Sequence, residues 1–579
     1  MERRILIAVI LSFLVLYAYQ TLFVPPPPAS RTEAPPPGAS TPATEPAAPS
    51  PPPAPAPPAP SAEPAPAVLG EAAEREIVVE TSTVTATLSN RGGRIVRWQL
   101  EGYRDEGGAP VDLVPSALPA DEPSPFLLSV DNEELTRRLN TALYRVTGDT
   151  AGRVDARTSE ASVVFEFEDA AGLRARKELR FDPRTYLITF SAEVRSGEAT
   201  LNPTVLWGPG LGDLGAVSAG GSFFTGNYIQ PPQAIFHRDG DVTRIAATNI
   251  GQQPVQEGQF RFAGIDDHYF IATAVNPGQA RLEFRLAPLP GPGGATRQFI
   301  AQSITFPEPP QDVRFFFGPK QFDLLRSIDA ELVRAINFGV FGWLAVPLLG
   351  ALQWIQGYVG NWGWAIVLLT IAINLTIFPL RHKSVVSMRK MQALQPQLKA
   401  IQDRYKELKV TDPARQKMNT EIMNLYREKG VNPASGCVPM LLQFPVLLAF
   451  YSMLSQSIEL RGAEFGWWIT DLSRPDPYYV VPVLMAVTMF WQTRITPTTA
   501  DPSQQRVMML MPLLFTVFFL WAPSGLVIYW FVSNLWAIGQ QYFTNWLIGP
   551  PAVAMVRPPA ERRLKKVGEG RTGGAEKPS

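Results

Sequence analysis

Uncharged polar side chains stand out in the second half of this 579-residue sequence, because they interrupt long runs without Asp, Glu, Lys or Arg. These residues are Thr370, Asn374, Gln443, Gln492, Thr516, Tyr529, Ser533 and Asn534. Their hydroxyl and amide groups form hydrogen bonds but do not ionise near neutral pH. Taken singly, each is best interpreted as a contact between helices, which contributes about 0.6–2 kcal/mol. Their spread over at least four apolar runs favours a shared wet cavity for a polar substrate.

The chemistry that these runs lack narrows the function classes. Ion-coupled transporters need charged side chains inside the bilayer, and the runs at 335–380, 430–458, 477–493 and 507–556 contain none. The motif G-x-x-x-x-G-K-[ST] used for ATP hydrolysis is also absent. With one cysteine and three scattered histidines, we expect no metal site and no cofactor. The sequence predicts a passive site that moves polypeptide, lipid or solute, and not an enzyme.

Two motifs in the more charged part of the chain resemble functional sites. Residues Gly210 to Gly215 fit G-x-G-x-x-G, but the sequence that follows does not begin the helix that a dinucleotide site requires. The string Asp266-Asp267-His268 contains groups that bind metals or transfer protons. A short turn between two strands is the favoured interpretation of this string.

The N-terminal segment predicts a membrane anchor followed by a tether. The apolar run 5–24 covers about 30 Å as a helix, which is the thickness of a bilayer core. It ends without a small-residue cleavage pattern, so residues 1–24 are predicted to be an uncleaved signal anchor. Arg3 and Arg4 hold its N-terminus in the cytoplasm. Residues 25–70 are rich in Pro and Ala and predict an extended tether.

Residues 71–320 show the period-two pattern of β-strands. Examples are Val84-Thr85-Ala86-Thr87-Leu88 and Tyr186-Leu187-Ile188-Thr189-Phe190, and turns rich in Gly, Asn, Asp and Pro separate such runs. Many short strands with short turns predict a large all-β sandwich. Residues 321–360 follow, and the segment 338–358 with Trp343 and Trp354 is predicted to be a helix that lies at the outer membrane interface.

The remaining apolar runs predict an all-α polytopic membrane bundle. The loop 381–436 carries twelve basic and five acidic residues, so it is expected in the cytoplasm, which requires an odd number of crossings before it. The expected spans are 362–380, 438–456, 478–493, 507–521 and 526–548. Together with the anchor they make six spans, and the basic tail 549–579 is then cytoplasmic.

The loop 381–436 is itself predicted to form a cytoplasmic helical hairpin. Its apolar residues recur at helical spacing, and Pro396 and Pro413 interrupt the pattern. We interpret this hairpin as an element that recruits clients. The recruiting residues are predicted to be Met388, Met391, Gln395, Pro396 and Tyr405. For its basic outer face, a solvated surface, contact with lipid headgroups and contact with ribosomal RNA all remain open.

Motifs over residues 361–548 make this sequence resemble the YidC-type membrane protein insertases. They are Asn361-Trp362-Gly363-Trp364, Pro379-Leu380, Met391 with Leu394-Gln395-Pro396, the run 431–437, Gln443-Phe444-Pro445, Asp476-Pro477-Tyr478-Tyr479, Thr496-Pro497-Thr498-Thr499, Met511-Pro512 and the run 523–530. Asn90-Arg91-Gly92-Gly93 and Phe317-Gly318-Pro319-Lys320 are similar to motifs of the Gram-negative branch, which has a large periplasmic domain.

This resemblance implies a five-helix insertase core at 361–548 with a hydrophilic groove that is open to the cytoplasm and the lipid. The polar outer segment of a client enters the groove, and its hydrophobic helix moves into the lipid. The implied groove residues are Thr370, Asn374, Gln443, Thr516, Tyr529, Trp530 and Ser533. The family usually has an arginine where this chain has Asn374, so electrostatic attraction of acidic client segments is expected to be weaker here. Trp530 stands where a tyrosine is frequent.

The implied partners are newly made membrane proteins, the lipid bilayer, a Sec translocon, and the ribosome through the basic loop and tail. The implied location is the inner membrane, with both termini in the cytoplasm and the β domain in the periplasm. Two other functions stay open at this point. One is a channel or transporter with a periplasmic ligand-binding β domain, and the other is an anchored envelope protein that binds or modifies carbohydrate.

Overall fold

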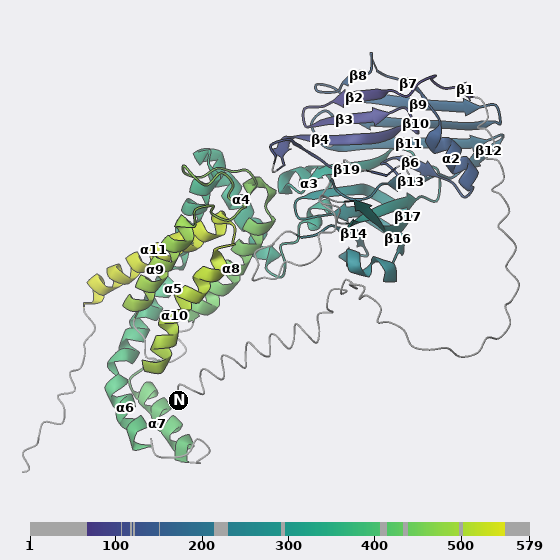
Figure 1. Ribbon diagram of the computed structural model, residues 1–579. Coiled ribbons are helices and arrows are strands. Elements are labelled where there is room, and N and C mark those ends of the chain that lie inside the picture. Colours follow the sequence, from purple (N-terminus) through teal and green to yellow (C-terminus); the bar gives the residue numbers. More distant parts are fainter. Residues whose placement is uncertain are drawn as a thin grey trace, which may run out of the picture. The chain divides into compact units, whose positions relative to one another are not determined.

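The computed structural model describes residues 67–105, 107–115, 118–119, 122–149, 151–212, 230–290, 296–405, 414–431, 438–496 and 502–549. The predicted anchor, most of the tether, the break at Pro413 and the basic tail lie outside these residues. The chain divides into two compact units, with the boundary between Asn337 and Phe338. We call them the β unit and the helical unit, and Figure 1 shows the elements of each.

The β unit contains two sheets. The larger sheet is formed by β1 (Ala67–Leu69), β6 (Leu127–Ser129), β7 (Arg145–Thr147), β9 (Ala161–Asp169), β10 (Leu173–Phe181), β11 (Leu187–Ser196), β12 (Ala199–Leu201), β13 (Thr204–Trp207), β14 (Gln233–Arg238), β15 (Asp241–Ala246), β16 (Val255–Asp266), β17 (Phe270–Pro290), β18 (Thr296–Thr305) and β19 (Val313–Pro319). The smaller sheet has the order β5 (Pro110–Asp112), β4 (Arg94–Arg104), β3 (Val84–Ser89), β2 (Glu76–Glu80) and β8 (Arg153–Asp155). The described residues of the unit also form the α-helices α2 (Glu133–Thr141) and α3 (Phe322–Ile328) and two short 3-10 helices, Ala247–Gln252 and Leu332–Ala335.

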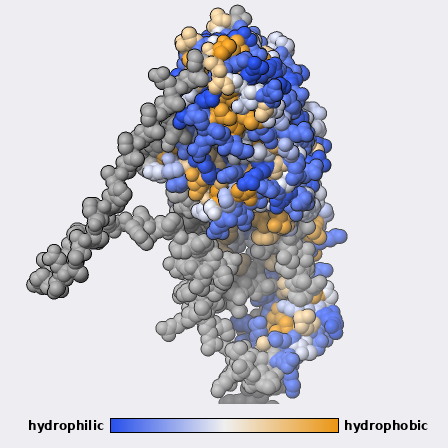
Figure 2. Space-filling view, turned by 90° about the vertical axis from the view of Figure 1, so that its right-hand side faces the viewer, coloured by the Kyte–Doolittle hydropathy of each residue, from blue (hydrophilic) through white to orange (hydrophobic). Residues whose placement is uncertain are grey.

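The two sheets pack face to face, as the period-two pattern predicted. In β10 the residues at alternate positions are buried, from Leu173 to Phe181. Trp98 of β4 packs its ring against Phe181 and Phe317 of the larger sheet. Its indole Nε1 also donates to the backbone oxygen of Phe317, at 2.8 Å. Figure 2 shows that the visible face of this unit is mostly hydrophilic, with small separate hydrophobic patches.

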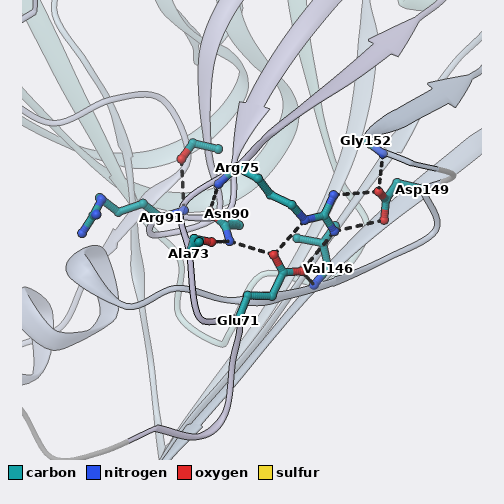
Figure 3. A network of polar contacts seen from close by, with 9 residues as sticks. Glu71, Ala73, Arg75, Asn90, Arg91, Val146, Asp149 and Gly152 are labelled. Atoms are coloured by element: carbon teal, nitrogen blue, oxygen red, sulfur yellow. Dashed lines mark hydrogen bonds and ion pairs between the residues drawn. The ribbon is translucent and has the colours of Figure 1, made fainter.

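The Asn90-Arg91-Gly92-Gly93 motif forms a junction in the β unit (Figure 3). The buried Asn90 accepts from the backbone nitrogen of Arg75 at 2.9 Å and donates to Glu71 and to the backbone oxygen of Ala73, both at 2.9 Å. The Arg75 guanidinium forms ion pairs with Glu71 and Asp149, each at 2.7 Å. These contacts fix the first residues after the predicted tether to the β unit.

A buried lysine of β10 joins the same motif to a second turn. The Lys177 ammonium donates to the backbone oxygens of Gly92 at 2.5 Å, Phe126 at 2.8 Å and Gly93 at 3.4 Å. All three oxygens belong to residues with positive φ, between 57° and 71°. Phe126 pays a steric penalty in that conformation, because it has a side chain. Burial lowers the pKa of Lys177 to about 7.

We expect Lys177→Met to destabilise the β unit by about 3 kcal/mol near neutral pH, because buried carbonyl groups would lose their donor. Between pH 7 and the ordinary lysine pKa near 10.4, the unfolded chain binds more protons at this site than the folded chain. The stability of the wild-type β unit should therefore rise with pH across this window. Hydrogen exchange of the β10 amides in the full chain, corrected for intrinsic rates, measures both effects. A variant with wild-type stability and the same pH slope would contradict this role.

The Asp266-Asp267-His268 string of the β unit forms a structural turn. Asp266 ends β16, and Asp267 accepts from the backbone nitrogens of Tyr269 at 2.8 Å and Phe270 at 2.7 Å. This is the short turn favoured from the sequence. Lys320, from the Phe317-Gly318-Pro319-Lys320 motif, donates to Asp266 at 3.0 Å. The second half of the G-x-G-x-x-G string lies outside the described residues.

The helical unit contains eight helices in the described residues. They are α4 (Gly342–Val359), α5 (Trp362–Ala393), α6 (Gln395–Arg404), α7 (Ala414–Glu428), α8 (Val438–Gln456), α9 (Val480–Ile495), α10 (Pro502–Phe519) and α11 (Ser524–Ile548). In the described part, only α5 is both long and apolar enough to cross a membrane by itself, while Val480–Ile495 and Met508–Val517 are shorter apolar segments. The six spans therefore stay a prediction.

Helix α5 continues without a break from Trp362 to Ala393, so it runs through Arg381, where the predicted cytoplasmic segment begins. The sequence count of charges locates a membrane boundary, but a helix does not end where the membrane ends. The first interruption of the helix comes at Leu394, two residues before Pro396, which lies in the first turn of α6. The first arm of the hairpin therefore consists of the end of α5 together with α6, and Figure 1 shows α6 and α7 side by side beyond α5.

Candidate functional site

Two of the predicted groove residues lie one turn apart on α5. Thr370 is fully buried, and its hydroxyl donates to the backbone oxygen of Ile366 at 2.6 Å. Asn374 is also buried and donates to the backbone oxygen of Thr370 at 2.8 Å and to the Ser533 hydroxyl of α11 at 3.5 Å. The amide oxygen of Asn374 is left to accept from another group.

The group that donates to the amide oxygen of Asn374 is Arg381, which was predicted to lie in the cytoplasmic loop. Its guanidinium donates to Asn374 Oδ1 at 3.3 Å and to Gln443 Oε1 of α8 at 2.9 Å. Arg381 lies two turns after Asn374 on the same helix, and its side chain extends back toward the bundle. In the described part of the chain, both of its hydrogen-bond partners are neutral amides. The site therefore contains a positive charge that the sequence analysis missed.

Tyr529 of α11 completes a cluster of polar groups from three helices. Its ring stacks on Phe450 of α8 with centroids 4.2 Å apart. Its hydroxyl interacts with Ser533 and lies within electrostatic reach of Arg381. We call the following residues the polar cluster: Thr370, Asn374, Arg381, Gln443, Tyr529 and Ser533.

The two other predicted groove residues lie elsewhere. Trp530 packs against Phe515 and Phe519 of α10, with centroids 6.0 and 5.1 Å apart. The Thr516 hydroxyl donates to the backbone oxygen of Pro512 at 2.7 Å, so it bonds within its own helix. Among the described contacts, no hydrogen bond joins either residue to the polar cluster.

A second set of polar contacts, also missed from the sequence, joins α5 to the end of α11. Gln540 donates to the backbone oxygen of Phe378 at 3.3 Å, and His382 lies 3.3 Å from the Thr544 hydroxyl. Arg389 donates to the backbone oxygen of Gly549 at 2.7 Å. Gln540 lies in the charge-free run 507–556, so its polar side chain was a signal in the sequence for this contact. The interface between α5 and α11 is thus polar along its second half.

The N-terminal part of α5, before the polar cluster, lies in an apolar and closely packed end of the bundle. Ala365, Ile366 and Leu369 of α5 are buried. A side chain at Gly525 of α11 would meet Ile366 at 3.2 Å, so the helices approach closely there. The backbone nitrogen of Gly525 also donates to the oxygen of Leu472 at 2.9 Å. The polarity of the bundle therefore increases along α5 from its N-terminal end toward Arg381.

The hairpin residues have mixed environments. Met391 is buried and packs with Leu394, Val431 and Tyr426 at the base of the hairpin. Tyr405 donates to Glu421 of α7 at 2.8 Å, and this hydrogen bond raises the pKa of Tyr405. Of the remaining predicted residues, Met388, Gln395 and Pro396 are half-buried. Met391 and Tyr405 therefore hold the hairpin together, and its exposed face consists of other residues.

Comparison with known proteins assigns the chain to a family. A family model described as the YidC periplasmic domain matches residues 76–351, and one described as the 60Kd inner membrane protein matches residues 354–549. The membrane protein insertase YidC of Geobacter metallireducens is 35% identical over 94% of this chain and 98% of that protein. The protein of the same name from Geotalea daltonii is 34% identical over 94% of this chain and 99% of that protein.

This chain belongs to the YidC family.

A solved structure, described as an active YidC insertase with its first transmembrane domain resolved, is 20% identical and covers 83% of this chain and 94% of that chain, with a TM-score of 0.34. Because that score is low, the assignment depends on the sequence relatives. The family assignment confirms the resemblance found in the sequence, including the resemblance to the branch with a large periplasmic domain. As a member of the YidC family, the chain is an inner membrane protein with a β-rich periplasmic domain and a helical C-terminal region. The relatives give no support to the channel or transporter alternative.

Proposed function

We propose that this protein inserts membrane proteins by offering the polar cluster to the hydrophilic outer segment of a client. The contact of Arg381 with Asn374 and Gln443 carries this proposal. Two neutral amides hold the guanidinium without neutralising its charge. An acidic or carbonyl-rich client segment is therefore the partner that this arrangement favours.

The energetics need no cofactor. An unpaired backbone polar group in hydrocarbon costs several kcal/mol, so a hydrophilic segment does not cross bare lipid. Amide, hydroxyl and guanidinium groups lower this barrier by replacing water as hydrogen-bond partners. Burial of the hydrophobic helix of the client, at about 25 cal/mol per Å², then drives its release into the lipid. The protein acts in this scheme as a passive catalyst of transfer and changes no covalent bond.

The arrangement in the membrane forms part of the proposal. Six spans place both termini in the cytoplasm, and α4 lies at the outer interface with Trp343 and Trp354 exposed. The polar half of the α5–α11 interface then faces the cytoplasm. We propose that the groove includes the polar cluster and extends toward Thr516 and Trp530. We propose that the hairpin recruits clients, that the ribosome binds through the basic loop and tail, and that a Sec translocon is a further partner.

Charge-swapped clients test this proposal directly. Single-span clients that differ only in the acidity of the outer segment are inserted into proteoliposomes that contain the full chain. We expect the acidic client to insert faster than its neutral counterpart. Equal rates for both clients, with normal insertion overall, would show that the Arg381 charge has no part in transfer.

We also expect the β unit to be dispensable for insertion. Deletion of residues 70–310 with the anchor kept should preserve insertion of a small single-span client, because every residue of the polar cluster lies in the helical unit. The insertion rate per folded protein measures this effect. Complete loss of insertion by a truncated protein with intact helical content would contradict the assignment of the site.

A further inference from the structure

The segment between α8 and α9 contains a short finger formed by residues Phe465 to Ile469. These two residues form an isolated β-bridge, and the backbone nitrogen of Phe465 donates to the oxygen of Ile469 at 2.8 Å. Gly466 turns the chain with φ of +72°. Trp467 at the tip is 99% exposed. An indole side chain in this position gives up almost all of the stabilisation that burial offers.

The base of the finger is fixed to the start of α5. The ring of Phe465 occupies the space beside Gly363, where an added Cβ would lie only 2.1 Å from the ring. The same ring meets Trp364 edge-on, with centroids 5.6 Å apart. Asn361 donates to the backbone oxygen of Glu464 at 3.0 Å. These contacts fix the base of the finger to the start of α5.

The other side of the finger is fixed to the start of α9. The carboxylate of the buried Asp476 accepts from Trp468 Nε1 at 3.1 Å and from the backbone nitrogens of Tyr478 at 3.0 Å and Val481 at 2.8 Å. The two adjacent tryptophans therefore differ in their contacts with the fold. Trp468 is bound within the fold, whereas Trp467 is held away from it.

Other exposed aromatic side chains surround the points where α5 and α9 begin. Trp364 is 55% exposed, and Tyr478 is 71% exposed. Trp364 lies in the first turn of the apolar helix α5, and Tyr478 lies two residues before the apolar helix α9. Trp and Tyr gather at such positions in membrane proteins, because the headgroup region accepts an apolar ring together with a polar N–H or O–H group.

We propose that Trp467 inserts into the headgroup region of the lipid bilayer and fixes the height of the closely packed end of the helical unit. Under the topology proposed above, this is the outer leaflet. The inference depends on the membrane location of the helical unit, which the family supplies, and not on the polar cluster. A second copy, the β unit or another protein would be a different occupant, and the experiment separates them from lipid.

The test places an environment-sensitive fluorophore at the tip of the finger. Cys437→Ser gives a background without cysteine, and Trp467→Cys is labelled with NBD in proteoliposomes of phosphatidylethanolamine and phosphatidylglycerol. Two reference variants carry the same label. Asp239→Cys in the β unit, where the side chain is 88% exposed, reports water. Leu513→Cys on the apolar part of α10, where the residue is 67% exposed, reports the lipid interior.

We expect the label at position 467 to be quenched most by a spin label on the lipid headgroup and severalfold less by iodide than the label at 239. The label at 513 should be quenched most by a spin label deep in the acyl chain. Iodide quenching at 467 equal to that at 239 would overturn the proposal. So would protection from iodide without quenching by either spin-labelled lipid, because that result identifies protein as the occupant.

Discussion

Replacing the hairpin residues 395–430 by a short Gly/Ser linker is expected to lower insertion at least tenfold while leaving the remaining helices folded. The hairpin is stabilised mainly by its own contacts, because both Tyr405 and Arg404 bond to Glu421 across it. In the described part of the chain, the small cluster of Met391, Leu394 and Val431 packs at its base. Loss of the hairpin should therefore remove recruitment of clients without exposing the core of the bundle. The insertion rate in proteoliposomes and the helical circular dichroism signal measure the two effects.

A matched variant separates the geometry of the hairpin from its presence. Tyr405→Phe removes one hydrogen bond to Glu421 and keeps the ring, so a smaller loss of insertion is expected, within a few fold. Hydrogen exchange should be faster in α6 and α7 than in α5, since most side chains on their outer faces are exposed. Full activity of the protein without a hairpin would show that recruitment depends on another element.

The second large effect is expected at Arg381. Arg381→Gln should slow insertion of clients with acidic outer segments about tenfold, because a hydrogen bond to a charged group contributes about 1.5–3 kcal/mol. Neutral clients should be affected much less. Arg381→Lys keeps the charge but loses the fork that reaches both Asn374 and Gln443, so it should recover only part of the rate. Insertion rates of paired clients measure all three variants.

A charge transplant provides the sharpest control. Asn374→Arg combined with Arg381→Gln moves the cation two turns along α5, to the position where the sequence resemblance places the arginine of the family. If the cluster is wet, this change should be tolerated and should restore the preference for acidic clients. An arginine facing lipid at this depth would instead cost about 2.5–3.5 kcal/mol or more. Lys390→Gln removes an exposed charge of the same helix and should leave the preference unchanged.

The β-rich unit and most of the polar cluster were predictable from the sequence, because both depend on local patterns. Alternation of apolar residues predicts strands such as Leu173–Phe181. Polar residues in charge-free runs predicted Thr370, Asn374, Gln443, Tyr529 and Ser533, which the structure brings together. Thr516 of α10 and Trp530 of α11 could not be separated from them, because periodicity alone does not tell which side of a helix faces the polar cluster.

Arg381 was missed for a different physical reason. A count of charges treats the first arginine after an apolar run as part of the next loop, and the long side chain is not considered. Here the helix continues, and the side chain reaches back along it to Asn374. The role of Lys177 in the β unit was also not predictable from the sequence, because its partners are distant along the chain. The sequence showed the turn Asn90-Arg91-Gly92-Gly93, but not the distant ammonium that its carbonyl groups bind.

Photo-crosslinking from Gln443 tests the central claim most directly. A photoreactive residue at this position faces the Arg381 guanidinium, and the same residue at Leu513 provides a reference on the exposed apolar surface of α10. A client stalled during synthesis is crosslinked at increasing chain lengths. We predict crosslinks from 443 to the polar outer segment of the client at short lengths, and from 513 to its hydrophobic helix only later. Crosslinks from 513 at every length, with none from 443, would contradict transfer through the polar cluster.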